Sequence, residues 1–486
     1  MYLGLDCGTS GLKALLIDES GAPVASAARA YAPERPKPGW SEQDPDAWRA
    51  AMADAIAELR RSKAEALGAV TAIGFSGQMH GAVLLDRSDR PVRPAILHND
   101  GRAAAEAAEL ALRHPDLAAI VGVKPMAGFI GPKLLWLKRH EPESRRRIDA
   151  VLCPKDYLRL ELTGERATDM SDAAGGWMLD EAARRWSSEA IAACEAECAW
   201  APPLLEGSAA AGEIRPAIAD ALGLPRGAVI AAGGGDAAVG AIGLGAIAPG
   251  EAFISLGTAT QLIVATDRYL SAPEKLVHSF AHALPARWYA MAAMLNGAGA
   301  LAFAGRLLGS DPGALEREAA QGYEGPGRLL FLPYLSGERT PLDDSEARGV
   351  LFGLGEATSR ADVARAVMEG VALTLAEARD CLAAAGATIE RAGLIGGGAK
   401  SALWTRMIAA ATGLTVVRMA GGETGPALGA ARLARMAATG EPPEAVSTAP
   451  AIAAVTEPEP RLAEAFRQQR MRFKALYEAV KGEFRR

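Results

Sequence analysis

A single carboxylate follows a run of glycines near the middle of the chain. The apolar residues 228–232 lead into glycines 233–235 and Asp236, and small residues follow over 237–245. This pattern predicts a buried strand, a glycine turn and a helix whose first turn carries Asp236. Because a helix N-terminus favours negative charge, we expect an ionised carboxylate that takes a proton from a hydroxyl beside a bound phosphate. A plain Asp cap after a glycine turn fits this segment equally well.

The opening residues predict a phosphate-sized turn between two strands. Residues 2–5 and 12–18 are apolar, and the turn between them is polar and punctuated by glycine. Its backbone N–H groups, hydroxyls and ammonium group can surround an anion, and its carboxylate can hold Mg²⁺ through water. The anion-binding residues are Gly8, Thr9, Ser10 and Lys13, and the metal-binding carboxylate is Asp6.

A second turn of the same kind lies in the later half of the chain. The apolar residues 252–256 lead into Gly257-Thr258, and another apolar run follows. When the two Gly-Thr pairs are aligned, Ser255 stands where the first copy has Asp6. The chain therefore reads as a duplicated fold that closes on one nucleotide, with the metal-type carboxylate on one side only.

A third polar turn mixes hydrogen-bonding and apolar side chains. Gln78, Met79 and His80 follow a predicted strand and stand between two glycines. A sugar needs such a mixture, because its hydroxyls require polar partners and its C–H faces an apolar surface. We expect Asn99 and Asp100, which end another short apolar run, to form a second wall of the same pocket. The alternative is that Met79 and His80 simply cover the core of the domain.

A further glycine turn follows the predicted strand 393–395. Gly397, Gly398 and Ala399 would let a flat adenosine approach the backbone, with Lys400 near its rim. A plain tight turn is the competing interpretation.

Length and composition predict a two-domain globular protein. The chain has 486 residues, of which 50% are hydrophobic and 23% are charged. A chain of this length is too long for a single hydrophobic core. From residue 232 onward the sequence becomes rich in glycine and alanine, and we place the domain boundary near residue 245. We therefore expect domains at 1–245 and 246–440, and a linker with a terminal helix over 441–486 that packs back on the body.

Charge and cysteine content exclude several classes of protein. A net charge of −6 argues against a nucleic-acid binder, and the basic run 145–147 is typical of a solvated helix face. The N-terminus has no basic segment before its apolar residues, and no apolar stretch is long enough to span a bilayer. Five scattered cysteines suggest reduced thiols rather than disulfides or a zinc site. We expect a cytoplasmic protein without nucleic-acid or membrane partners.

Several longer motifs resemble the FGGY carbohydrate kinases, and within that family the xylulokinases. The resemblance runs from residue 1 to about residue 440, with family signatures at 128–140 and 349–369. The other matching motifs are Trp40-Ser41-Glu42-Gln43-Asp44-Pro45, Gln78-Met79-His80-Gly81, Pro154-Lys155-Asp156-Tyr157-Leu158 and Leu332-Pro333-Tyr334-Leu335-Ser336-Gly337-Glu338-Arg339-Thr340-Pro341.

This resemblance implies an α/β fold of two ribonuclease-H-like, actin-like ATPase domains with ATP-Mg²⁺ in the cleft between them. It implies phosphoryl transfer from ATP to a primary hydroxyl of D-xylulose, and it is compatible with a homodimer. The implied roles are the catalytic base at Asp236, the metal and phosphate neighbour at Asp6, the sugar contacts at Met79 and His80, the first phosphate turn at Thr9, Ser10 and Lys13, the second at Gly257 and Thr258, and the adenosine side at Gly397, Gly398 and Ala399.

Three positions depart from the xylulokinase pattern. Ala237 stands where Asn usually follows the base, His98 stands where Trp is usual, and Ile130 stands where Thr or Ser is usual. A site without one sugar-facing amide suits a substrate that lacks or inverts a hydroxyl, so another ketose or a pentitol is an alternative. A second alternative is a non-catalytic, nucleotide-dependent regulator, although such a protein need not keep both Asp6 and Asp236.

Overall fold

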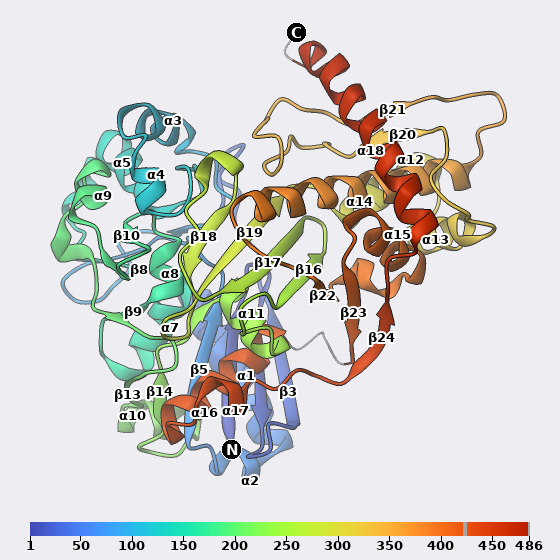
Figure 1. Ribbon diagram of the computed structural model, residues 1–486. Helices are drawn as coiled ribbons and strands as arrows, with labels where there is room; N and C mark the ends of the chain where they lie inside the picture. Colours follow the sequence, from blue (N-terminus) through green and yellow to red (C-terminus); the bar gives the residue numbers. More distant parts are fainter. Residues whose placement is uncertain (421–424, 485–486) are drawn as a thin grey trace.

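Two seven-stranded sheets organise the chain (Figure 1). The computed structural model describes residues 1–420 and 425–484. In spatial order the first sheet contains β13 (Ala210–Glu213), β14 (Val229–Ala231), β5 (Ala72–Gly77), β1 (Tyr2–Cys7), β2 (Gly11–Ile17) and β3 (Pro23–Ala30), and β15 (Gly234–Gly235) also pairs with β5. The second sheet contains β18 (His278–Ala281), β19 (Trp288–Met294), β17 (Thr260–Thr266), β16 (Ala252–Leu256), β22 (Arg391–Ile395), β23 (Thr415–Met419) and β24 (Ile452–Thr456).

Both sheets are built on the same three-strand pattern. β1 is antiparallel to β2 and parallel to β5, and β16 is antiparallel to β17 and parallel to β22. Asp6 pairs with Lys13 in the first hairpin, and Ser255 pairs with Gln261 in the second. This repeat confirms the duplicated α/β fold that the two Gly-Thr turns predict.

One late helix lies directly on the first sheet. α16 (Gly425–Thr439), which the sequence prediction groups with the second domain, contacts β1, β2 and β5. A Cβ atom on Gly4 would lie 2.0 Å from the Ala427 carbonyl oxygen, and one on Gly74 would lie 1.9 Å from the Ala430 carbonyl oxygen. Glycine at these two strand positions therefore allows the helix backbone to approach the sheet. The other helices that contact this sheet include α1 (Pro45–Ser62), α7 (Pro154–Thr163) and α11 (Asp236–Leu244).

The helices of the second half surround a long central helix. α14 (Arg360–Ala384) begins with a capping box formed by Ser359 and Asp362, and its middle is buried. α18 (Pro460–Val480) packs on α14 and α15 with Phe466 and Phe473 inside the core. The remaining elements here are α12 (Ala298–Leu308), α13 (Pro312–Ala320), α15 (Ala402–Thr412), β20 (Leu330–Leu332), β21 (Val350–Phe352) and the 3₁₀ turn η3 (Gly397–Lys400).

A lobe of short elements lies beside the first sheet and contributes to the site. Its elements are β4 (Glu42–Gln43), β6 (Val83–Leu85), β7 (Ala95–Ile96), α3 (Ala104–Arg113), α4 (Leu117–Ile120), α5 (Ile130–His140), α6 (Pro142–Arg146), β8 (Ala150–Leu152), β9 (Thr168–Asp169), α8 (Met170–Ala174), β10 (Leu179–Asp180), β11 (Arg185–Trp186), α9 (Ser188–Ala193) and β12 (Leu204–Leu205). Three further short helices lie outside this lobe: α2 (Ala64–Gly68) and α10 (Pro216–Leu222) contact α1, and α17 (Pro443–Val446) contacts α16.

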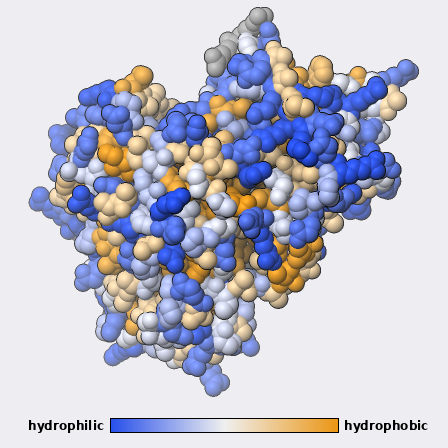
Figure 2. All heavy atoms as spheres, viewed as in Figure 1, coloured by the Kyte–Doolittle hydropathy of each residue, from blue (hydrophilic) through white to orange (hydrophobic). Residues whose placement is uncertain are grey.

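Exposed large hydrophobic side chains are scattered along the described chain, among them Leu112, Leu307 and Met471. In Figure 2, hydrophilic residues cover much of the visible face and hydrophobic ones form small groups among them. Within residues 1–420 and 425–484, no helix combines the length and the apolar character needed to cross a membrane.

Candidate active site

The strand register brings the two predicted carboxylates to neighbouring positions. β5 pairs in parallel with β1 through Ser76 opposite Asp6, and with β15 through Ser76 opposite Gly234. Asp236 follows β15 directly as the first residue of α11. Because the carboxyl ends of parallel strands meet at one edge of a sheet, Asp6 and Asp236 lie at the same edge although they are far apart in sequence.

The environment of Asp236 corrects one expectation. Burial, together with repulsion from nearby Asp6, raises the pKa of Asp236 to about 7, and the N–H of Ala237, 2.8 Å from Oδ1, partly opposes this. Protein atoms surround the carboxyl group, yet solvent still reaches the residue. A residue at the floor of an open cleft has this combination. The carboxyl group is therefore only partly ionised at neutral pH. This differs from the ionised carboxylate that the helix N-terminus alone predicts, because the helix N-terminus does not offset the nearby Asp6 and the loss of water.

Asp6 has the features of a cation ligand. Burial raises the pKa of Asp6 to about 6, and Ser76 and Lys13 partly offset the increase. Its Oδ1 is buried and has no hydrogen-bond partner among the described residues. A buried carboxylate oxygen without a donor is costly unless a cation or ordered water satisfies it. The chemistry of this atom fits a hydrated Mg²⁺.

The turn predicted to bind the first phosphate is held from behind by the side-chain amides of Gln43 and Gln78. Gln43 donates from Nε2 to the Thr9 carbonyl at 2.7 Å, and the Thr9 hydroxyl donates to Gln78 Oε1 at 3.1 Å. Gln78 Nε2 donates to Gln43 Oε1 at 3.0 Å, and the indole N–H of Trp48 donates to the same oxygen at 3.0 Å. The sequence predicts that Gln78 faces the sugar, but its amide oxygen contacts Thr9 and its amide nitrogen contacts Gln43. The sequence analysis assigns no role to Gln43 or Trp48.

The second predicted phosphate turn lies beside the glycine turn over 396–399. The N–H of Ala298 at the start of α12 donates to the Gly257 carbonyl at 2.7 Å. A Cβ atom on Gly398 would lie 2.4 Å from the side chain of Leu256, the residue before the turn. The predicted phosphate and adenosine residues of the second domain are therefore adjacent, and Thr258 and Gly397 are exposed between them.

The predicted sugar residues lie against the strand that precedes the base. A Cβ atom on Gly235 would lie 2.5 Å from Met79 Cγ, so Met79 packs directly on the backbone before Asp236. His80 Nδ1 lies 2.8 Å from the Gly175 carbonyl oxygen. A carbonyl only accepts, so this contact assigns the proton to Nδ1 and leaves Nε2 as an acceptor. Burial lowers the pKa of His80 well below its usual value, so the ring is neutral.

Known proteins share this arrangement along nearly the whole chain. The N-terminal domain model of the FGGY family of carbohydrate kinases matches residues 1–243, and the C-terminal domain model matches residues 252–438. The chain belongs to this family.

Individual members of the family are similar in sequence and structure. The chain is 48% identical to a xylulose kinase of Escherichia coli (strain K12) and 46% identical to one of Klebsiella pneumoniae, over 91% and 90% of each chain. A solved xyloylose kinase from Brucella ovis has 45% identity and a TM-score of 0.97, with 99% of both chains covered. A solved xylulose kinase from Rhodospirillum rubrum has 28% identity and a TM-score of 0.92, with full coverage of both. The chain is thus a carbohydrate kinase with the actin-like ATPase fold that the sequence predicts.

The structure places Asp100 of this FGGY kinase inside the protein rather than on the pocket wall. Its carboxylate accepts the N–H of Ser41 at 2.6 Å and pairs with the Arg102 guanidinium at 2.7 and 2.8 Å, and 2% of the residue is exposed. Asn99 beside it is exposed. His98 is half-buried, its Nδ1 has no partner among the described residues, and burial lowers its pKa to about 4. Asp100 therefore holds the turn that presents His98 and Asn99.

The FGGY kinase also places groups near His80 that sequence reasoning missed. The Phe129 ring lies 4.7 Å from His80 and 6.4 Å from His278, a residue of β18 in the second sheet. Lys133 is fully buried and donates to the carbonyl of His80 at 2.7 Å. Lys133 belongs to the motif over 128–140, but the sequence analysis assigns it no role. No local pattern in the sequence indicates that His278 of β18 lies near a turn of the first half.

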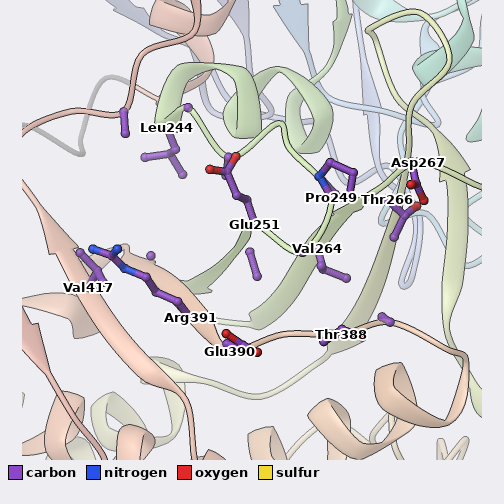
Figure 3. Close-up of a pocket in the computed structure, with 18 of the residues that line it drawn as sticks. Leu244, Pro249, Glu251, Val264, Thr266, Asp267, Thr388, Glu390, Arg391 and Val417 are labelled. Atoms are coloured by element: carbon purple, nitrogen blue, oxygen red, sulfur yellow. The ribbon is translucent and has the colours of Figure 1, made fainter. Parts of the chain in front are cut away.

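A cavity of about 810 Å³ lies away from these groups (Figure 3). Its lining includes Leu244, which ends α11, and Ala252, which begins β16. Asp236 begins α11 and Gly257 follows β16, so each lies at the opposite end of its element from the residue that lines the cavity. The cavity is therefore separated from the predicted site by the lengths of α11 and β16. Its wall carries opposite charges, including Glu390 and Arg391. None of the predicted site residues lines it, and it has no part in the chemistry below.

Proposed function

We propose that this kinase transfers the γ-phosphoryl group of ATP to a primary hydroxyl of D-xylulose and forms D-xylulose 5-phosphate. The carrying observation is the position of Asp236, which stands beside Asp6 at one sheet edge with Met79 packed on the backbone before it. The two relatives of highest identity named above are xylulose kinases, which supports the choice of sugar.

Asp236 acts as the general base in this proposal. A base with a pKa near the working pH combines a useful ionised fraction with a real affinity for the proton, and the pKa of about 7 meets this condition. The carboxylate removes the proton of the attacking hydroxyl as the bond to phosphorus forms. Its N–H contact from Ala237 fixes one oxygen and leaves the other for the substrate.

The two glycine turns hold the phosphates from opposite domains. Thr9, Ser10 and Lys13 belong to one turn and Thr258 to the other, and Ser10 and Thr258 are exposed to an incoming ligand. When bound near Asp6, Mg²⁺ supplies positive charge that offsets the charge of the phosphoryl oxygens. The turn over Gly397–Lys400 receives the adenosine, because its small residues leave room for a flat ring.

The sugar lies between Met79 and His80. The Nε2 of neutral His80 accepts a hydroxyl proton, and the Met79 thioether covers a C–H face. Closure of the two domains excludes water, which otherwise competes with the sugar for the phosphoryl group.

The test is ADP release from ATP-Mg²⁺ with D-xylulose, D-ribulose, L-xylulose, L-ribulose, glycerol and pentitols. We expect the highest kcat/KM with D-xylulose. Asp236→Asn should lower kcat by roughly 10³-fold while ATP binding, measured by calorimetry, stays intact. Substantial turnover by Asp236→Asn would disprove its role as the base, and absence of turnover with every acceptor would favour a non-catalytic regulator.

A second candidate is a kinase of another ketose or of a pentitol. Ala237, His98 and Ile130 favour it, because all three differ from the usual xylulokinase residues and His98 offers an unused acceptor or donor at Nδ1. A preference for another acceptor in the same panel would make these positions the determinants of specificity.

We further propose a cytoplasmic enzyme that works as a homodimer and contacts neither nucleic acid nor membrane. Sedimentation equilibrium tests the dimer directly, since the monomer mass is 50.4 kDa.

A further inference from the structure

A fully buried cluster of charges lies behind the strand that precedes the base. The Lys155 ammonium is 2.6 Å from Asp156 Oδ1, 2.9 Å from Asp169 Oδ1 and 3.2 Å from Asp172 Oδ2. All four side chains have no exposed surface. Burial alone would lower the pKa of Lys155, but the three carboxylates together raise it, so it stays charged. A buried ion cluster is seldom more stable than apolar side chains of similar volume, so its stability alone does not explain its presence.

One branch of this cluster reaches the glycine strand, residues 233–235, that precedes Asp236. Asp169 Oδ2 accepts the hydroxyl of Ser171 at 2.5 Å, and that hydroxyl oxygen accepts the backbone N–H of Gly235 at 2.9 Å. Ser171 is completely buried. A continuous chain of hydrogen bonds therefore runs from Lys155 through Asp169 and Ser171 to the residue before Asp236.

A local structural role accounts for only part of these contacts. Asp169 is the N-cap of α8 and accepts the N–H groups of Ser171 and Asp172 at 2.7 and 3.3 Å. An N-cap needs no more than these backbone donors. It explains neither the ion pair with Lys155 nor the bond from the Ser171 hydroxyl to a residue 64 positions later in the chain.

Backbone pairing with Ser76 and Gly77 of β5 holds the glycine strand before Asp236 in register, but this strand has no side chains of its own to fix it further. It consists of glycines, so no side chain of 233–235 anchors it, and glycine backbones have the greatest freedom to lose. On one side Met79 packs against Gly235, and a Cβ atom on Gly234 would lie 2.9 Å from the Ser171 hydroxyl oxygen. Ser171 thus contacts both of the last two glycines before the base.

We infer that Ser171, held by Asp169 and Lys155, is a positioning residue for Asp236. The hydroxyl fixes the Gly235 N–H, and this sets the direction in which α11 presents the carboxylate to the acceptor hydroxyl. Displacement of a catalytic group by about 1 Å can cost two orders of magnitude in rate, so a buried hydrogen bond one residue from the base has a direct effect on turnover. The inference rests on the proposed role of Asp236.

The test compares Ser171→Ala with Ser171→Thr in the full-length enzyme. Ser171→Ala should lower kcat about tenfold or more and leave KM for ATP unchanged, because the phosphate turns do not depend on this bond. Ser171→Thr keeps the hydroxyl and should restore most of the rate. Thr412→Val is the matched control, since the buried Thr412 hydroxyl also accepts a backbone N–H, from Leu414 at 3.3 Å, but lies in the second domain.

The outcomes separate this inference from the proposed function. If Asp236→Asn is inactive and Ser171→Ala matches the control in kcat, the positioning role is overturned and the base stands. If Asp236→Asn remains active, both are overturned. If Ser171→Ala lowers the folded fraction, activity per folded molecule and the rescue by Thr still decide, because a structural defect alone would not leave KM for ATP intact while kcat falls.

Discussion

Gln43 offers the sharpest test of how the first phosphate turn is held. Its amide donates to the Thr9 carbonyl and accepts from Gln78 and Trp48, and the side chain is 2% exposed. The variant Gln43→Leu keeps a similar volume but removes all three hydrogen bonds. The Thr9 carbonyl, the Gln78 amide and the Trp48 indole would then be buried without their partner.

The expected loss of stability follows from these groups. Each unsatisfied buried group costs roughly 1 kcal/mol or more, so the three together cost about 3 kcal/mol. For a domain of this size, 1 kcal/mol corresponds to about 2–4 °C in Tm, and the predicted decrease is about 6–12 °C. The turn also loses its support, so KM for ATP should rise roughly tenfold, whereas KM for the sugar should stay constant.

The assay combines thermal unfolding with steady-state kinetics, and Trp48→Phe is the matched control. Trp48→Phe removes one donor while Gln43 keeps Gln78 and Thr9, so the loss should be about 1 kcal/mol with no change in KM for ATP. A normal KM for ATP in Gln43→Leu would refute this reasoning, whether or not the variant is less stable. The hydrogen bonds of Gln43 would then have no part in phosphate binding.

Four further predictions concern Asp236, Asp6 and Gly74. At the lowest Mg²⁺ concentration that supports turnover, kcat/KM for the sugar should rise with pH through about 7, because Asp236 must lose its proton to act as a base. A kcat/KM that does not change between pH 5 and pH 9 would contradict this. Since the folded pKa of Asp236 is raised, its ionisation weakens folding as pH increases from about 4 to 7, so Asp236→Asn should raise Tm at pH 8 and have little effect near pH 4, and an equal effect at both would contradict the assignment. Asp6→Asn should increase the Mg²⁺ concentration needed for half-maximal turnover without weakening metal-free ATP binding, and an unchanged requirement would remove Asp6 from the metal site. Gly74→Ala would place a Cβ atom 1.9 Å from the Ala430 carbonyl oxygen, and the overpacking should cost about 1–3 kcal/mol in denaturant unfolding; normal stability would mean that α16 can move away.

Local patterns in the sequence predict the parts of the site that are contiguous along the chain. A glycine turn after an apolar run identifies Asp6, Asp236 and the second Gly-Thr turn, because strand ends and helix starts have strong local signatures. The duplication is also visible, since both hairpins keep the same order of apolar and glycine residues. These features needed no knowledge of tertiary contacts.

Other parts of the site depend on contacts between distant segments. His278 reaches the ring cluster of His80 only because β18 of the second sheet packs against the lobe of the first, and a strand sequence does not state which element it will face. Gln78 follows strand β5 as expected, yet its amide contacts Gln43 and Thr9, whereas the sequence predicts a sugar-facing side chain. The direction of a side chain in a turn is set by tertiary partners, which the sequence pattern does not contain.

The charge of Asp236 illustrates why the two carboxylates have to be considered together. Taken alone, a carboxylate at a helix start is stabilised in its ionised form. Asp6 is separated from the strand before Asp236 by a single strand, β5, whose Ser76 pairs with both. Each negative charge raises the pKa of the other carboxyl group. A cation beside Asp6 would relieve this repulsion and lower the pKa of Asp236. Metal binding would thus increase the ionised fraction of the base at the moment when the phosphoryl donor is also in place, and the apparent pKa in kcat/KM for the sugar should fall as the Mg²⁺ concentration increases.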